Sequence, residues 1–232
     1  MNSGKELKTW EQALPPEGVI CVYGHRRKGK TGTAWWLAER LQLKRKVAAF
    51  LFPAKARKLL PKWVKHLSTI DELKKLRGYV VVADEMAIHA FARDHQSDTN
   101  KELYKLMAVA AQCHQLLFLI AQHTRQLDVG LAMEPDRLIL KQPSLLHIRF
   151  ARPELRPEIQ QAWDKFHSFR GEKRSRAYVV DFHEGRTGFL HTKLPTFWSE
   201  ELSEAYARYE METLTQLKGK KPKGKTKGRL QK

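Results

Sequence analysis

The sequence predicts an α/β fold in which a central, mostly parallel β-sheet is flanked by helices and followed by a C-terminal β-hairpin and helix. Short apolar runs of strand length alternate with segments whose apolar residues recur at helical spacing. One such run, 19–23, leads into a glycine-rich loop and then into a helical segment, 33–41. A second run, 79–85, is rich in β-branched residues and ends in two acids. A strand, a loop and a helix in this order are typical of a nucleotide-binding α/β domain.

The glycine-rich loop matches the pattern G-x-x-x-x-G-K-[ST] at every fixed position, which predicts a P-loop. Glycines let backbone N–H groups face phosphates, and a helix beginning near Lys30 adds the positive end of its dipole. Lys30 is expected to reach the β- and γ-phosphates of ATP, and the Thr31 hydroxyl to ligate Mg²⁺. The residues expected to bind the nucleotide are Gly24, His25, Arg26, Arg27, Lys28, Gly29, Lys30, Thr31 and Gly32.

The four variable positions of this loop are His25, Arg26, Arg27 and Lys28, so three of them are cationic. A loop that used only backbone amides would not require these charges. They add charge at the phosphates, form salt bridges with acids across a subunit boundary, or face DNA. The sequence leaves these three interpretations open.

The run 79–85 has the Walker B pattern of an apolar strand that ends in acids. Asp84 is expected to hold Mg²⁺, directly or through water. Glu85 is expected to orient and deprotonate the attacking water. One step along a strand turns the side chain to the other face, so adjacent acids suit two different tasks.

The chain has a formal net charge of +18 and a pI near 10, which indicates a polyanionic partner such as nucleic acid. Residues 218–232 hold eight Lys or Arg and no acid, and the rest of the chain still carries +10. Between His25 and Lys65, thirteen Lys or Arg accompany one acid, Glu39. A solvated basic surface is the alternative interpretation.

The first half of the chain contains further predicted elements. A short helix over 5–13 is stopped by two prolines, and 46–52 is a buried strand. The segment 54–67 is predicted to be a helical excursion with a cationic face. A capping box predicts a helix over 69–76, ended by Gly78, and 86–98 is expected to be a loop.

The second half begins with a helix that a second capping box starts at residue 99. The other predicted elements are strands over 115–121, 137–140 and 146–150, a helix over 159–166, a hairpin of 178–182 and 188–191, and a final helix over 198–209.

The chain is predicted to have three segments: an N-terminal extension (1–17), an ATPase domain (18–214) and a basic, disordered tail (215–232).

The two cysteines, Cys21 and Cys113, are expected to be small buried residues of a protein in the reducing cytosol. The N-terminus has no apolar signal region, and no apolar run approaches membrane-spanning length.

The P-loop, the strand ending in Asp84-Glu85 and the next strand ending in Gln122 together resemble the FtsK–HerA superfamily of DNA-pumping ATPases. The resemblance covers about residues 18–200. It implies a RecA-like (ASCE) P-loop NTPase fold, with Gln122 sensing the γ-phosphate. The short, basic P-loop is similar to that of the compact genome-packaging ATPases of internal-membrane and double-jelly-roll viruses. The stretch from 178 to 198 resembles phage-encoded ATPases, including the Zot-like group.

FtsK-type motors carry an arginine that acts in trans shortly before the strand that ends in the glutamine. The corresponding stretch 110–114 has none, so Arg137 and Arg125 are the candidates, with Arg93 as a third. An arginine acting in trans implies a homo-oligomeric ring, as a pentamer or hexamer. For each of these arginines an ordinary surface position is the alternative.

The predicted function is an ATP-hydrolysing translocase of double-stranded DNA, expected in the host cytoplasm or associated with the virion, with a capsid vertex or portal-like protein as a further partner. Three alternatives stay open. They are a Zot-like morphogenesis ATPase, an AAA+ loader or transposition ATPase, and a non-enzymatic DNA-binding assembly protein with a structural P-loop. The strands predicted at 178–182 and 188–191 argue against the helical lid of an AAA+ protein.

Overall fold

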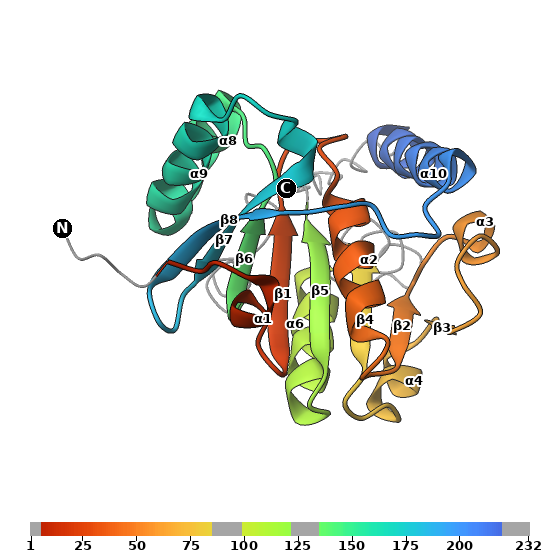
Figure 1. Cartoon of the computed structure of the whole chain (residues 1–232). Helices are drawn as coiled ribbons and strands as arrows, with labels where there is room; N and C mark the ends of the chain where they lie inside the picture. Colours follow the sequence, from red (N-terminus) through yellow and green to blue (C-terminus); the bar gives the residue numbers. More distant parts are fainter. Residues whose placement is uncertain (1–5, 85–98, 122–134, 220–232) are drawn as a thin grey trace, which may run out of the picture.

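The computed structural model describes residues 6–84, 99–121 and 135–219, and within these ranges the strands form one eight-stranded sheet with the order β3-β2-β4-β5-β1-β6-β7-β8 (Figure 1). The strands from β3 to β6 in this order run parallel, and β7 and β8 are antiparallel. The predicted α/β fold is therefore confirmed. The strands are β1 (Gly18–Tyr23), β2 (Val47–Phe50), β3 (Val64–Leu67), β4 (Val80–Asp84), β5 (Leu116–Ala121), β6 (Arg137–Leu140), β7 (Arg176–Asp181) and β8 (Arg186–His191).

Helices cover both faces of the sheet. On one face α4 (Ile70–Lys74), α6 (Thr99–Gln112) and α9 (Arg156–Ser168) pack against the strands. On the other face lie α1, α2, α3 and α10. The bounds of these and the remaining helical elements are α1 (Trp10–Ala13), α2 (Lys30–Leu41), α3 (Ala54–Arg57), α8 (Leu145–Phe150), α10 (Glu200–Gly219) and the 3₁₀ turns η1 (Pro153–Leu155) and η2 (Lys173–Ser175).

The strands carry apolar residues at nearly every position because helices cover both faces of the sheet. In β4, Val81 and Ala83 belong to the cluster that includes α6, whereas Val80 and Val82 belong to the cluster that includes α2. Alternate residues thus serve opposite layers, as the period of two requires. Cys21 and Cys113 are both buried, in agreement with the predicted burial.

The segment 54–67 differs from the predicted helical excursion. It contains the one-turn helix α3 and then β3, which pairs with β2 at the edge of the sheet. A helix that started at Ala54 cannot continue through Pro61, because proline lacks the N–H and clashes with the preceding turn. Val64 and Leu67 are buried while Lys65 and His66 are exposed, so β3 presents charge at the open edge.

The strand predicted over 146–150 is also wrong. These residues form α8, which Ser144 caps together with His147. A short apolar run does not by itself distinguish a strand from a helix. The N-terminal helix is shorter than predicted, since Thr9 caps α1 at Trp10 and the Leu7 N–H pairs instead with the Thr187 carbonyl at 2.8 Å.

A connector of residues 192–199, called the strap below, leads from β8 to α10 across the P-loop side of the sheet (Figure 1). Among the described residues no helix is long and apolar enough to cross a membrane. The predictions for Glu85, for the loop 86–98, and for Gln122 and Arg125 fall on residues outside the described ranges. The disordered tail was predicted over 215–232, but residues 215–219 belong to α10, and the rest of the tail lies outside the described residues.

Candidate active site

The P-loop and the Walker B strand end at the same edge of the sheet. Tyr23, the last residue of β1, pairs with Ala121 of β5 and with Leu140 of β6. Asp84, the last residue of β4, pairs with Ile120 of β5. In parallel α/β sheets, ligands bind outside the carboxyl ends of the strands. This edge of the sheet is therefore the candidate site.

Two glycines give the P-loop its shape. Gly24 has φ 148°, and a Cβ there would lie 2.4 Å from the Lys141 carbonyl oxygen. Gly29 has φ 85°, in the left-handed region, and is the N-cap of α2. No side chain hydrogen-bonds the cap, and a helix N-terminus of this kind directs backbone N–H groups toward a bound anion.

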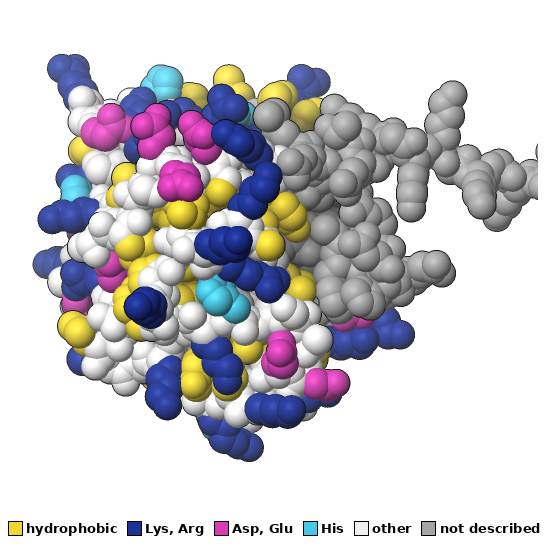
Figure 2. Space-filling view, turned by 90° about the vertical axis from the view of Figure 1, so that its right-hand side faces the viewer, with side chains coloured by type: hydrophobic (Ala, Val, Ile, Leu, Met, Phe, Trp, Pro, Cys, Tyr) yellow, Lys and Arg dark blue, Asp and Glu magenta, His cyan; other side chains and the backbone are white. Residues whose placement is uncertain are grey.

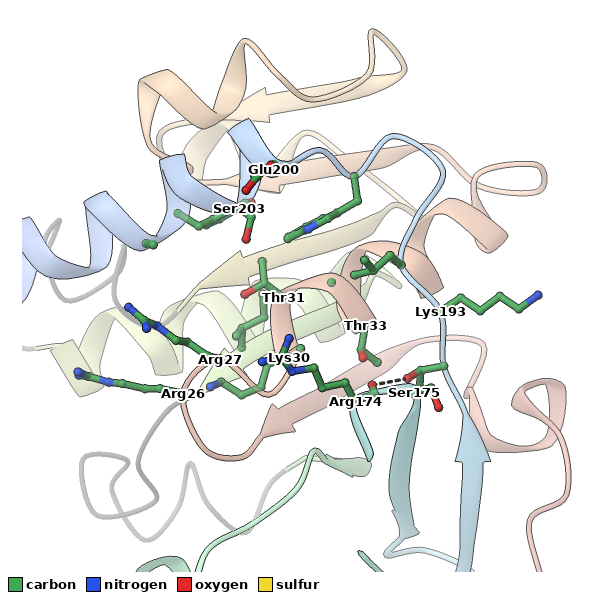
Figure 3. Close-up of a pocket in the computed structure, with 18 of the residues that line it drawn as sticks. Arg26, Arg27, Lys30, Thr31, Thr33, Arg174, Ser175, Lys193, Glu200 and Ser203 are labelled. Carbon is green, nitrogen blue, oxygen red and sulfur yellow. Dashed lines mark hydrogen bonds between the residues drawn. The ribbon is translucent and has the colours of Figure 1, made fainter. Parts of the chain in front are cut away.

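Lys30 is 7% exposed, and its ammonium donates a 3.2 Å hydrogen bond to the His25 carbonyl across the loop. Thr31 lines the same cavity as Lys30 (Figure 3). Asp84 lines it as well, and the cavity has a volume of about 1110 Å³. The hydroxyl, the carboxylate and the ammonium that the sequence assigned to Mg²⁺ and phosphate thus share one space.

A further arginine lines this cavity from the far end of the sequence. Arg174, in η2, extends toward the P-loop, whereas the Lys193 side chain points outward (Figure 3). Arg174 is not among the residues that the sequence predicts for this site. Its neighbours carry no motif, and only the pairing of β6 with β7 brings η2 to this edge.

The strap forms one wall of the cavity. The Thr192 N–H bonds the Ser175 carbonyl at 2.8 Å, and the Thr196 N–H donates to both carboxylate oxygens of Glu39 on α2, at 2.9 and 3.0 Å. Leu194 passes so close to Gly32 that a Cβ on that glycine would lie 2.7 Å from Leu194 Cδ2. The strap is therefore fixed to η2 at one end and to α2 at the other.

Aromatic residues at the end of the strap and within α10 continue this wall. Trp198 stacks on Tyr206, with ring centroids 6.0 Å apart, and the Tyr206 hydroxyl accepts a 3.0 Å hydrogen bond from Trp35 Nε1 on α2. Burial raises the pKa of Tyr206 well above its ordinary value, so its hydroxyl stays protonated. Glu200 and Ser203 of α10 face the P-loop from across the cavity (Figure 3).

Most of the predicted site residues that the structure describes line this cavity. Gly24 shapes the turn beneath the loop, and His25 packs edge-on against His147, with ring centroids 5.7 Å apart. Lys28 is half-buried but does not line the cavity. The predicted residues that line it are Arg26, Arg27, Gly29, Lys30, Thr31, Gly32 and Asp84.

Arg26 and Arg27 extend from the loop on the side opposite to Lys193 (Figure 3). Arg27 itself adopts φ 58°, a left-handed conformation that turns the chain toward Gly29. Both arginines line the cavity, and their role at the phosphates, at a neighbouring subunit or on DNA stays a prediction.

The structure corrects the prediction for Arg137. This residue begins β6 and pairs with Ile20 near the start of β1, at the opposite edge of the sheet from the P-loop. Its guanidinium is nearly buried and forms a 2.8 Å ion pair with Asp181. A buried, paired guanidinium is not available to the nucleotide of a neighbouring subunit. Glu85, Gln122, Arg125 and Arg93 lie outside the described residues.

The described residues fit a nucleotide with Mg²⁺. An uncapped helix N-terminus preceded by a left-handed glycine presents backbone N–H groups, and Lys30, Arg27 and Arg174 supply positive charge around it. Oxygen donors suit Mg²⁺, and Thr31 and Asp84 offer a hydroxyl and a carboxylate in the same cavity. In such a site the metal screens phosphate charge.

No protein-family model and no curated protein sequence matches this chain. Several solved structures match it in fold. The genome packaging NTPase B204 of Sulfolobus turreted icosahedral virus 2, in complex with sulfate, is 12% identical with a TM-score of 0.54, over 78% of this chain and 99% of that one. The same NTPase with ATP-γ-S gives a TM-score of 0.53 at 12% identity, over 78% of this chain and 100% of that one. The protein therefore has the mixed α/β fold of these P-loop NTPases, as the resemblance to DNA-pumping ATPases implied.

Proposed function

We propose that this protein is an ATP-hydrolysing translocase of double-stranded DNA that serves as a viral or phage genome-packaging motor. The observation that carries the proposal is the placement of Lys30, Thr31 and Asp84 around one cavity at the N-terminus of α2. The fold shared with a viral packaging NTPase supports the choice of motor.

The side chains divide the chemistry between them. Lys30 leaves the His25 carbonyl and neutralises the β- and γ-phosphates, while Thr31 and Asp84 hold Mg²⁺. Glu85 follows Asp84 directly and orients and deprotonates the attacking water. Gln122 follows β5, the strand between the P-loop strand and the Walker B strand, and senses the γ-phosphate.

The positive charge of the chain is the basis for the proposed contact with DNA. The net charge is +18, and Lys and Arg side chains are scattered over the face shown in Figure 2. Exposed lysines of α3, β3 and their connection, Lys55, Lys58, Lys62 and Lys65, add positive charge near one sheet edge. Such contacts bind phosphates without reading sequence.

The motor works as a homo-oligomeric ring, a pentamer or hexamer, in the host cytoplasm or on the virion, docked on a capsid vertex or portal-like protein. Arg125 or Arg93 then serves the neighbouring subunit's nucleotide. Residues 1–17 are an extension, 18–214 the ATPase domain and 215–232 a basic tail.

The deciding experiment measures ATP turnover with and without duplex DNA, together with the mass of the oligomer in solution. The wild type is compared with Glu85→Gln and with Lys44→Gln, an exposed lysine just after α2 that serves as the control. We expect DNA to stimulate the wild type and the control, and turnover by Glu85→Gln to fall at least 10²-fold. If duplex DNA does not change the rate of ATP turnover by the wild type, and DNA binding shows no steep dependence on salt, the proposal of a translocase is wrong.

The antiparallel hairpin of β7 and β8 supports this proposal over an AAA+ loader, because strands, not a helical lid, continue the sheet after β6. A protein that keeps the P-loop only for structure would bind DNA but show no turnover sensitive to Glu85→Gln. A Zot-like morphogenesis ATPase would instead hydrolyse ATP without stimulation by DNA.

A further inference from the structure

A second lysine lies beneath the P-loop. Lys141 follows β6 directly and is fully buried, with 0% exposure. Its ammonium donates a 2.7 Å hydrogen bond to the Arg174 carbonyl and a 2.9 Å hydrogen bond to Thr192 Oγ1. Arg174 and Thr192 line the nucleotide cavity from η2 and from the strap. One side chain thus joins two walls of the cavity.

Lys141 also lies close to both shaping glycines of the P-loop. Its N–H donates to the Tyr23 carbonyl at 2.7 Å, and its own carbonyl lies under Gly24. A Cβ on Gly29 would lie 3.7 Å from Lys141 Cε. The residue therefore connects the end of β1, the N-cap of α2, η2 and the strap.

Several of the charged or titratable groups on the elements around Lys141 are basic. They are Lys30 on α2, Arg174 on η2, His191 on β8 and Lys193 on the strap, and the acids that line the cavity are Asp84, Glu172, Glu200 and Glu204. Among the described residues no carboxylate forms an ion pair with Lys141, and its two hydrogen-bond acceptors are neutral. Burial lowers the pKa of Lys141 to about 7. At neutral pH the Lys141 amine is therefore uncharged in a substantial fraction of the protein that has no nucleotide bound.

We propose that Lys141 is a positioning residue of the nucleotide site, which fixes η2 and the strap against the P-loop and takes up a proton when nucleotide phosphates bind there. The inference rests on the proposed nucleotide binding. Phosphates cradled at Gly29 bring negative charge close to the Lys141 side chain, which stabilises its ammonium form. The neutral amine becomes an ammonium, and the proton comes from solvent.

The linkage has a definite sign. Because the pKa of Lys141 is higher in the bound than in the free protein, its contribution to affinity is complete below about pH 7 and declines as the pH rises above that value. A rise of one pKa unit on binding corresponds to a tenfold change in affinity.

Titration calorimetry of MgADP binding, in buffers of different ionisation enthalpy between pH 7 and 8, counts the protons taken up. The wild type is compared with Lys141→Met, which keeps the volume and removes the charge, and with Lys44→Met as the exposed control. We expect the wild type and the control to take up a fraction of a proton more than Lys141→Met. The proton that the nucleotide itself exchanges cancels in this difference.

Thr192→Val adds a second test, because it removes one acceptor of Lys141 and keeps the charge. In Thr192→Val the uptake of a proton on MgADP binding should persist while the affinity for MgADP weakens. A lysine with a purely structural role would not give proton uptake that is independent of the affinity.

If Lys141→Met does not fold, the wild type and Thr192→Val alone test the proposal. A lack of pH-dependent proton uptake in these two proteins refutes it. Equal uptake by wild type and Lys141→Met refutes only the role of Lys141, whereas absence of MgADP binding to the wild type refutes the proposed function as well.

Discussion

Arg137 and Asp181 face each other across β6 and β7 and form an ion pair of 2.8 Å between Nη1 and Oδ1. Asp181 is fully buried and also accepts a 2.8 Å bond from Arg186, with backbone N–H groups of His183 and Glu184 at 3.1 Å. The carboxylate thus ties the antiparallel hairpin to the parallel part of the sheet.

Asp181→Asn is predicted to destabilise the protein by about 3–5 kcal/mol, because it leaves the guanidinium of Arg137 buried without its counter-ion. Chemical denaturation measures this loss. The control is Lys74→Ala, which removes an exposed pair with Asp71 and should cost less than about 1 kcal/mol. Equal losses in the two variants would contradict a structural role for the buried pair.

The lowered pKa of Asp181 predicts how the stability of the protein falls at acid pH. Burial alone would raise the pKa of Asp181, but hydrogen bonds from Arg186 and the Glu184 N–H, and the charge of Arg137, outweigh it and lower this pKa. Its stabilisation is therefore complete above the ordinary aspartate pKa and is lost as the pH falls through the lowered value. Denaturation midpoints between pH 5 and 2 should fall less steeply in Asp181→Asn than in the wild type.

Gly24→Ala is predicted to abolish nucleotide binding and to destabilise the fold by at least about 1–3 kcal/mol. A Cβ would collide with the Lys141 carbonyl, and φ 148° is unfavourable for alanine. Binding of a fluorescent ATP analogue and thermal denaturation report the two effects. Gly185→Asn is the matched control, since that glycine has φ 60°, nothing lies within 4 Å of its Cβ position, and asparagine tolerates such a turn.

Glu39→Gln tests the attachment of the strap to α2. The substitution keeps the shape but weakens the acceptors of the Thr196 N–H, which lie at 2.9 and 3.0 Å. We expect a several-fold rise in the KM for ATP with little change in melting temperature. The control is Glu11→Gln, which alters an exposed pair with Arg40. A KM that responds equally to both substitutions would show that the strap does not position the nucleotide.

Deleting residues 220–232 removes seven Lys or Arg and leaves every described residue in place. The truncated protein should bind duplex DNA more weakly, with a shallower dependence of affinity on salt, because fewer phosphates are neutralised. Its basal ATP turnover should remain unchanged. Fluorescence anisotropy at several salt concentrations measures the slope, and an unchanged slope would exclude the tail from the DNA contact.

The sequence by itself predicted the α/β fold class and most of its strands, together with a glycine-rich loop between β1 and α2. Fixed spacing makes Gly24, Gly29, Lys30 and Thr31 recognisable, since a phosphate cradle is built from consecutive residues. The sequence also predicted that a buried strand ends at Asp84, as β4 does. Local chemistry also predicted the capped helix at Thr69, which has the capping box in the structure. Each of these features depends on neighbours in the chain.

Only the tertiary structure decided what distant residues do. Local sequence does not distinguish Arg137, which is buried against Asp181, from Arg174, which reaches the nucleotide cavity, because strand pairing sets which end of the sheet each arginine occupies. Edge pairing likewise made 64–67 a strand. Lys141 acquired its lowered pKa from burial among segments more than thirty residues away, Arg174 and Thr192. Burial and long-range pairing are properties of the assembled fold, so no local pattern encodes them.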